Sequence, residues 1–155
     1  MYNRQKAIEY AKRYAFNYND NFYDFTHIGG DCTNFVSQCL YAGKIEMDYS
    51  LNGWYYSSPQ KRSPSWTSVE EFWNYGLKNK NFRIEKINMY DLEVGDIIQF
   101  FNSHQNRFYH CVIVSKIIKP ISIQNIFVAS HDNNAFNKSL ALYNEVNFRF
   151  GKIIN

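Results

Sequence analysis

Apolar residues recur at the spacing of an α-helix in the first half of the chain. In the segment 3–18, Ile8 and Ala11 lie among charged residues, which predicts an amphipathic helix. The same spacing predicts a second helix over 32–42 and a third helix that begins after Thr67.

Capping residues indicate where two of these helices begin. Asp31 stands at the N-cap position of the second helix, and Gly43 follows its last residue. Thr67 and Glu70 have the spacing of a capping box, in which each side chain binds a free backbone N–H group.

The pattern changes in the second half of the chain to one typical of β-strands. Five segments rich in β-branched and aromatic residues are separated by polar turns: 82–87, 96–101, 108–118, 122–131 and 145–150. Helices followed by an antiparallel meander predict an α+β domain, with N-terminal helices packed on a C-terminal antiparallel sheet. No strand, glycine-rich loop and helix follow one another, so a nucleotide-binding βαβ fold is disfavoured.

The composition fits one folded domain over residues 1–155 with an unusual wealth of aromatic side chains. Hydrophobic residues make up 45% of the chain and aromatic residues 19%, enough for a thick core and for an aromatic-lined groove. The loop-like segment 43–66 contains Trp54, Tyr55 and Trp66. We expect these three side chains to wall a substrate groove, although each could equally pack in the core.

The charge pattern gives little indication of a charged partner. Seventeen basic and 14 acidic residues leave a net charge of +3, too small and too evenly spread to predict binding to nucleic acid. No segment has the length of a membrane span or of a signal peptide. The protein therefore either stays inside the cell or has lost a leader, and we expect a monomer.

Cys32 is a candidate nucleophile because it opens the second predicted helix. Free N–H groups and the positive end of the helix dipole stabilise a thiolate there, and they can also bind an oxyanion. Gly29 and Gly30 would let the chain turn sharply and a substrate approach closely. An ionised Asp31 would act against this, because its charge raises the pKa of the thiol.

The alternative roles for Cys32 are packing, metal binding and disulfide formation. Cys32 and Cys39 share one helix face, and a buried cysteine usually behaves as a small hydrophobic residue. Their Cα atoms should lie roughly 10 Å apart, too far for a disulfide and unsuited to a shared metal ion. The chain has no C-x-x-C or H-E-x-x-H spacing, so we expect neither a metal nor a cofactor.

A nucleophilic cysteine needs a base, and two of the four histidines are candidates. His27 and His104 lie in polar segments and are expected at the surface, whereas His110 lies within a predicted strand. If 108–118 and 122–131 form a hairpin turning at 120–121, His131 stands opposite His110, with Cβ atoms about 5 Å apart. A slip of one residue would move one histidine to the other face of the sheet.

With these residues, the chain resembles the bacterial putative amidase domain family of the papain-like cysteine hydrolase clan. The most specific block is "GGDCTNFVSQCLYAG"; "WYY", "SPSWT", "LEVGDIIQF", "YHCVIVSK" and "ASH" follow in the family's order. The resemblance runs from about residue 2 to about residue 150. It implies a papain-like fold related to the NlpC-type cell-wall peptidases, in which a helix with the cysteine packs on a sheet with the histidine.

The resemblance also implies roles for individual residues. Cys32 matches the nucleophile and His110 the general base, while His131 matches the polar third member that orients the imidazole. The residues after His131 depart from the family's usual pattern, so other candidates for the third member stay open: Asp132, Asn134 and Asp31.

The reaction implied by the resemblance is amide hydrolysis through a thioester, with peptides of the bacterial cell wall as the expected substrate class. A cell-wall substrate would require export. Two alternatives remain open from the sequence. One is an inactive module of the same fold that binds carbohydrate or peptide, and the other is an acyltransferase in which an amine replaces water.

Overall fold

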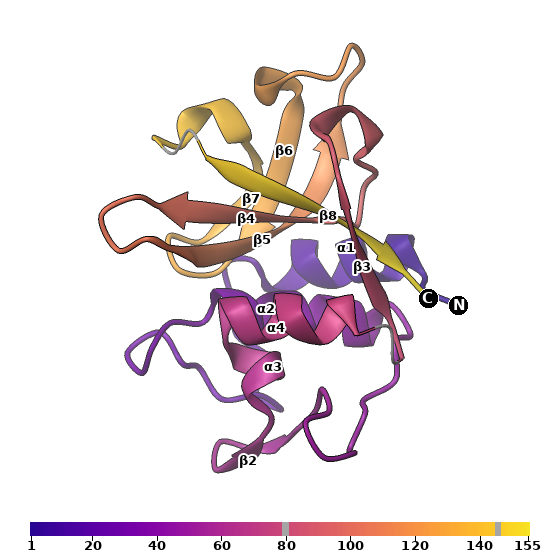
Figure 1. Ribbon diagram of the computed structural model, residues 1–155, viewed down its shortest axis with the longest axis vertical. Coiled ribbons are helices and arrows are strands. Elements are labelled where there is room, and N and C mark those ends of the chain that lie inside the picture. The colour runs from indigo at the N-terminus through magenta and orange to yellow at the C-terminus, as the bar shows by residue number, and fades with distance from the viewer. Residues whose placement is uncertain (79–80, 145–146) are drawn as a thin grey trace.

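A computed structural model describes residues 1–78, 81–144 and 147–155 as helices on one face of a six-stranded antiparallel sheet (Figure 1). The α-helices are α1 (Arg4–Tyr14), α2 (Cys32–Ala42), α3 (Pro64–Thr67) and α4 (Val69–Leu77). The sheet strands are β3 (Arg83–Ile87), β4 (Ile97–Asn102), β5 (Arg107–Ile117), β6 (Ile126–Ser130), β7 (Ala135–Ser139) and β8 (Phe148–Ile154). The predicted α+β class is confirmed at this level.

The strand order is β3-β8-β4-β5-β6-β7, and every neighbouring pair is antiparallel. A two-stranded ribbon of β1 (Tyr56–Ser58) and β2 (Lys61–Arg62) lies in the segment between α2 and α3. Short 3-10 helices η1 (Met89–Asp91), η2 (Ile123–Asn125) and η3 (Leu140–Leu142) connect the strands.

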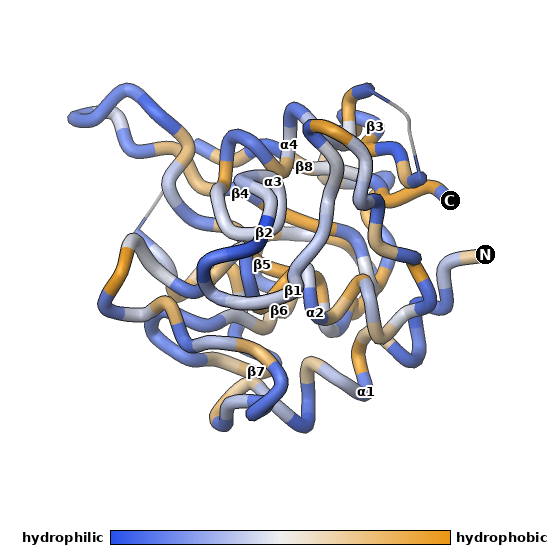
Figure 2. Tube along the Cα trace, turned by 90° about the horizontal axis from the view of Figure 1, so that it is seen from below, coloured by the Kyte–Doolittle hydropathy of each residue, from blue (hydrophilic) through white to orange (hydrophobic). Residues whose placement is uncertain are grey.

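Each face of the sheet has its own hydrophobic core. Cys111 and Ile113 of β5 face the helices and pack in the larger core, which includes the buried hydrophobic residues of α1, α2 and α4. Val112 and Val114 face the opposite way, with Leu140 of η3 in a smaller core. In Figure 2 the trace around β4, β5 and β6 is largely hydrophobic, whereas the outer loop at β2 is hydrophilic.

The N-terminal segment is bonded to the sheet by polar contacts. The Arg4 guanidinium binds the carboxylate of Asp96 at 2.7 Å and the carbonyl of Ile153 at 2.8 Å. Ala7 and Ala11 are fully buried, since their small side chains let α1 approach its neighbours closely. Within residues 1–78, 81–144 and 147–155, no helix is long and apolar enough to cross a membrane.

Several predicted boundaries differ from the structure. The first helix ends at Tyr14 rather than at residue 18, and the third helix begins at Val69 with Ser68 as its N-cap. Thr67 ends the short helix α3 instead, because Pro64 starts a helical turn of its own at a position suited to proline. The predicted capping box is therefore wrong.

The bounds of β3, β4 and β5 agree with the prediction to within one residue at each end, whereas those of β6, β7 and β8 do not. β6 is shorter than predicted because η2 takes the residues before it, and the edge strand β7 was missed because its sequence is polar. β8 covers Phe148–Ile154 rather than 145–150, and residues 145–146 of that prediction lie outside the described residues.

Candidate active site

Cys32 is the first residue of α2 and lies beneath a turn made by two glycines. Gly29 and Gly30 have φ values of +85° and +99°, a region that favours glycine, and Asp31 is the N-cap residue. The Cys32 side chain is only 5% exposed, and its Sγ lies 3.8 Å from the Thr33 hydroxyl. The predicted position of the thiol at a helix start is confirmed.

Burial governs the ionisation of the Cys32 thiol. It raises the pKa of Cys32 to about 11, helped by the negative charge of Asp132 and opposed by the backbone N–H of Cys111. The thiol is therefore protonated at neutral pH in this arrangement, in spite of its place at the helix N-terminus. Cys111, whose backbone N–H lowers the pKa of the Cys32 thiol, directly follows His110 in β5.

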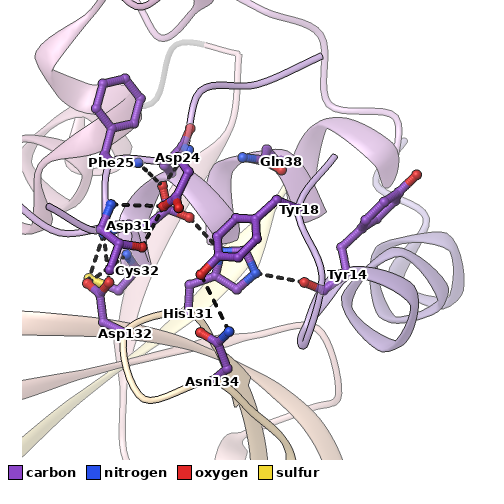
Figure 3. Close-up of polar contacts among 12 residues, drawn as sticks. Tyr14, Tyr18, Asp24, Phe25, Asp31, Cys32, Gln38, His131, Asp132 and Asn134 are labelled. Carbon is purple, nitrogen blue, oxygen red and sulfur yellow. Dashed lines mark hydrogen bonds and ion pairs between the residues drawn. The ribbon is translucent and has the colours of Figure 1, made fainter. Parts of the chain in front are cut away.

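Asp132 occupies the N–H groups at the start of α2 (Figure 3). Its carboxylate accepts hydrogen bonds from the backbone N–H of Asp31 at 2.8 Å and from that of Cys32 at 3.2 Å. A Cβ atom on Gly30 would lie 2.7 Å from the Asp132 Oδ2 atom. The space left by Gly30 is thus filled by Asp132, whereas the sequence predicted that it would admit a substrate.

Asp132 follows β6 in a strained turn and is half-buried. Asp132 and Asn133 have φ values of +60° and +64°, which aspartate and asparagine tolerate better than most residues. Burial raises the pKa of the Asp132 carboxyl, while the N–H groups of Asp31 and Cys32 lower it.

Asp31 does not cap α2 with its side chain as the sequence predicted. One carboxylate oxygen accepts from the Phe25 N–H at 2.8 Å and from the Asn34 amide at 2.9 Å. The other oxygen lies 2.5 Å from Nδ1 of His131. The carboxylate therefore ties the loop before α2 to the end of β6.

His131 is a buried residue with both ring nitrogens bonded. Nδ1 faces Asp31, and Nε2 lies 2.7 Å from the backbone carbonyl of Tyr14 at the end of α1 (Figure 3). The Phe35 ring stacks on the imidazole with a centroid distance of 4.2 Å, and the Tyr18 ring lies at 4.7 Å. His131 thus joins α1, α2 and β6.

His110 lies on the other face of the sheet. It is paired with Phe100 of β4, whose ring makes an edge contact with the imidazole at 5.1 Å, and it belongs to the side of β5 that faces away from the helices. Among the hydrogen bonds of the described residues, none joins the His110 ring to the Cys32 thiol.

The predicted pairing of the two histidines across a hairpin is wrong by one residue. In the structure Ile113 pairs with Ala129 and Val114 with Val128, before a bulge toward the far end of the strands. Continued toward the site, this register places Asp132 rather than His131 across from His110. A shift of one residue turns a side chain to the opposite face, which explains why His131 points to the helices.

A pocket of about 310 Å³ brings His110 and Asp132 together. Its lining includes Phe100, Tyr109, His110, Asp132, Lys138 and Tyr143. Because the Asp132 carboxylate bonds to the Cys32 N–H, the pocket adjoins the start of α2. Lys138 and Tyr143 were missed in the sequence, since nothing in a polar edge strand and its loop distinguishes them from surface residues.

The expected aromatic groove is not formed by the two tryptophans. Trp54 and Trp66 are fully buried and stack against each other at 4.6 Å. The Trp66 indole donates to Asn34 and the Trp54 indole to Ser37, so both support α2 from within the core. Tyr55 is half-buried and stays a candidate for contact with a substrate.

The remaining candidates lie apart from the pocket. Asn134 is exposed, and its amide lies 3.5 Å from the Tyr18 hydroxyl. Cys39 and Cys111 are free and fully buried like core residues. Over the part of the chain that the structure describes, no cluster of three or more His, Cys, Asp or Glu side chains could hold a metal ion.

The site thus places a thiol at the start of a helix that packs on the sheet, and a histidine on one strand of that sheet. The family model described as "Putative amidase domain" matches residues 1–154, and the chain belongs to this family. No solved structure matches the chain.

Two curated relatives come from Bacillus subtilis (strain 168). The chain is 31% identical to "Uncharacterized protein YhbB" over 120 residues, which are 74% of this chain and 37% of that protein. It is 27% identical to "Uncharacterized protein YjcM" over 101 residues, 64% of this chain and 22% of that protein. The chain therefore corresponds to about a third or less of the length of these relatives.

Proposed function

We propose that this domain is a cysteine amidohydrolase with Cys32 as nucleophile and His110 as general base and acid. Membership of the amidase family and the place of the thiol at a helix start, beside the pocket that holds His110, support the proposal. The helix with the cysteine packs on the antiparallel sheet with the histidine, which is compatible with the papain-like fold that we propose for the domain.

The first step is attack of the Cys32 sulfur on an amide carbonyl. The thiol proton passes to His110 as the S–C bond forms, and the carbonyl oxygen becomes an oxyanion. His110 then donates the proton to the leaving nitrogen as the C–N bond breaks, which leaves a thioester on Cys32. Water hydrolyses the thioester, giving the carboxylic acid and the free thiol.

Two contacts of the resting site must change for this reaction. The Cys32 N–H, which is suited to hold the oxyanion, is bonded to Asp132 and must be released. His110 must also approach the thiol more closely; catalytic hydrogen bonds are often long in a free enzyme and tighten when substrate binds.

We assign His131 and Asp31 to positioning of Cys32 rather than to the orientation of His110. Both nitrogens of His131 are bonded to groups outside the pocket, and Asp31 is the residue before the nucleophile. Asp132 is the better candidate for a polar partner of His110, because both line the same pocket.

A second candidate function is an inactive peptide- or carbohydrate-binding module of the same fold. The observation in its favour is the buried Cys32 thiol, whose pKa of about 11 leaves it protonated at neutral pH. An acyltransferase uses the same residues as the hydrolase and differs in the acceptor of the acyl group.

Thiol reactivity separates the enzyme from the binding module. Limiting iodoacetamide near neutral pH, followed by mass mapping, should modify an activated Cys32 faster than Cys39 or Cys111, which are fully buried and whose thiol pKa values burial raises. The three thiols thus serve as internal controls. Equal modification of all three would contradict an activated Cys32.

The matching assay for the reaction is digestion of purified peptidoglycan by the wild type and by Cys32→Ala, with the products identified by mass. New fragments that carry a free carboxyl and a free amine in the wild type alone would support hydrolysis. Transfer to an added amine such as hydroxylamine would instead show an acyltransferase. Unchanged ligand binding by Cys32→Ala without any turnover by the wild type would favour the binding module.

A further inference from the structure

One wall of the His110 pocket contains a lysine positioned to bind an anion. Lys138 of β7 pairs with Val128, whose side chain lies on the same face of the sheet as His110. The Lys138 ammonium lies 4.1 Å from the centre of the Tyr143 ring, and both residues line the pocket. This cation–π contact holds the charge at the pocket wall.

The charge of Lys138 is not neutralised by a carboxylate in the described part of the chain. None of the ion pairs there involves Lys138, and none brings an oxygen of Asp, Glu or the C-terminus within 4 Å of its ammonium group. Asp132 lines the same pocket, but its oxygens are bonded to the N–H groups of Asp31 and Cys32. Lys138 therefore retains N–H donors for a bound anion.

The rest of the pocket is suited to the apolar part of a small ligand. Phe100 and Tyr109 line it together with Leu142, which is 69% exposed. A volume of about 310 Å³ is at the lower end for small-molecule sites and suits one or two amino-acid residues.

The position of His110 indicates which side of a substrate would lie here. His110 lines the pocket, whereas Cys32 does not. In amide cleavage the general acid contacts the leaving nitrogen, while the cysteine contacts the acyl carbon. A group in the pocket therefore belongs to the amine that leaves.

We propose, building on the function above, that the domain removes a carboxy-terminal amino acid whose free carboxylate is bound by Lys138. The Cys32 sulfur bonds to the acyl carbon, the C–N bond breaks, and the proton held by His110 passes to the departing amine. The product that leaves through the pocket is a free amino acid, and water then hydrolyses the thioester.

Binding to the Cys32→Ala protein tests this subsite without any turnover. The probes are the dipeptide Ala-Ala and its C-terminal amide, in both stereochemical series, titrated at millimolar concentrations while the ring signals of His110 are followed by NMR. We expect the carboxylate form to bind about ten-fold more tightly, the value of one charge-assisted hydrogen bond. Equal binding of the two forms, or binding of neither, would overturn the proposal.

Lys138→Met and Lys116→Met provide a matched comparison. Methionine keeps an unbranched side chain, and Lys116 also places its ammonium over an aromatic ring, Phe127 at 5.7 Å, outside the pocket. Lys138→Met should abolish the preference for the carboxylate, and Lys116→Met should keep it. The same loss in both variants would show a non-specific effect of charge and reject the subsite.

The outcomes also separate this subsite from the proposed function. Carboxylate-selective binding with no cleavage by the wild type would support the subsite and contradict the hydrolase. Cleavage that is equally fast for free and amidated C-termini would support the hydrolase and contradict the subsite. With both correct, Lys138→Met raises KM for peptides with a free C-terminus more than it raises KM for amidated peptides.

Discussion

The two histidines near the start of α2 lie in contrasting environments. His131 is buried, stacked on Phe35 and bonded at both ring nitrogens to Asp31 and Tyr14. His110 lines a pocket on the other face of the sheet with Lys138. The comparison teaches that a histidine bonded at both nitrogens to its own chain supports the elements around it, whereas a histidine that lines a pocket lies within reach of a ligand.

The largest expected effect is on turnover in His110→Gln. If His110 is the general base and acid that we propose, its loss should lower the rate of amide cleavage by about 10²- to 10⁴-fold. His110 is only 7% exposed, so the free energy of unfolding should fall by about 1 kcal/mol, far less than the loss in turnover. Turnover on peptidoglycan fragments and thermal unfolding provide the two measurements.

The turnover of His110→Gln must be compared with that of His131→Gln. If His110→Gln keeps full turnover while His131→Gln loses it at unchanged stability, the two roles are reversed and the comparison is wrong.

The second effect is on stability in His131→Ala. Removal of the imidazole takes the partner of Oδ2 from the buried Asp31 carboxylate and one of two donors from the Tyr14 carbonyl, which should lower the free energy of unfolding by about 3 to 5 kcal/mol. Denaturant unfolding measures the change. Asn134→Ala is the control, since its exposed amide makes a single long contact and should cost about 0.5 kcal/mol or less. A cost as small for His131→Ala would contradict a supporting role.

These two residues also show how far the sequence could predict the site. Helix α2, its first residue Cys32 and the place of His110 within a strand follow from local periodicity and were predicted. The partner of His131 depended on the register between β5 and β6, and a bulge at the far end of the pair shifts that register. A bulge leaves no recognisable pattern in the local sequence, so the contact between His131 and Asp31 could not be predicted.

The two tryptophans and Lys138 show a second limit of prediction from the sequence. Trp54 and Trp66 lie in a loop-like segment rich in polar residues, yet both are buried because they pack under α2, far away in the sequence. Lys138 enters the pocket because an edge strand that the pattern did not reveal lies beside β6. Burial and pocket lining depend on such tertiary neighbours, whereas helix starts depend on residues close in sequence.

The third expected effect is a difference in stability between alanine variants of two adjacent glycines. Gly29→Ala and Gly30→Ala both place a side chain at positive φ, which costs about 1 to 3 kcal/mol. A Cβ atom on residue 29 meets no atom within 4 Å, whereas one on residue 30 would lie 2.7 Å from the Asp132 carboxylate. Gly30→Ala should therefore be the less stable variant in denaturant unfolding. Equal stability of the two would show that Asp132 is not held tightly at the start of α2.

The smallest effect is on thiol reactivity in Asp132→Asn. The Asp132 charge is one cause of the raised pKa of Cys32, so its removal should lower that pKa from about 11. At any pH below the pKa a larger fraction of the thiol is then ionised, and alkylation of Cys32 should become about three-fold faster. The pH profile of alkylation by iodoacetamide should shift to lower pH, since burial, the larger cause, is unchanged. An unshifted or slower profile would mean that the bond from the Cys32 N–H to Asp132 favours a reactive thiol, and Asp132 would then belong with His131 among the supporting residues rather than with His110.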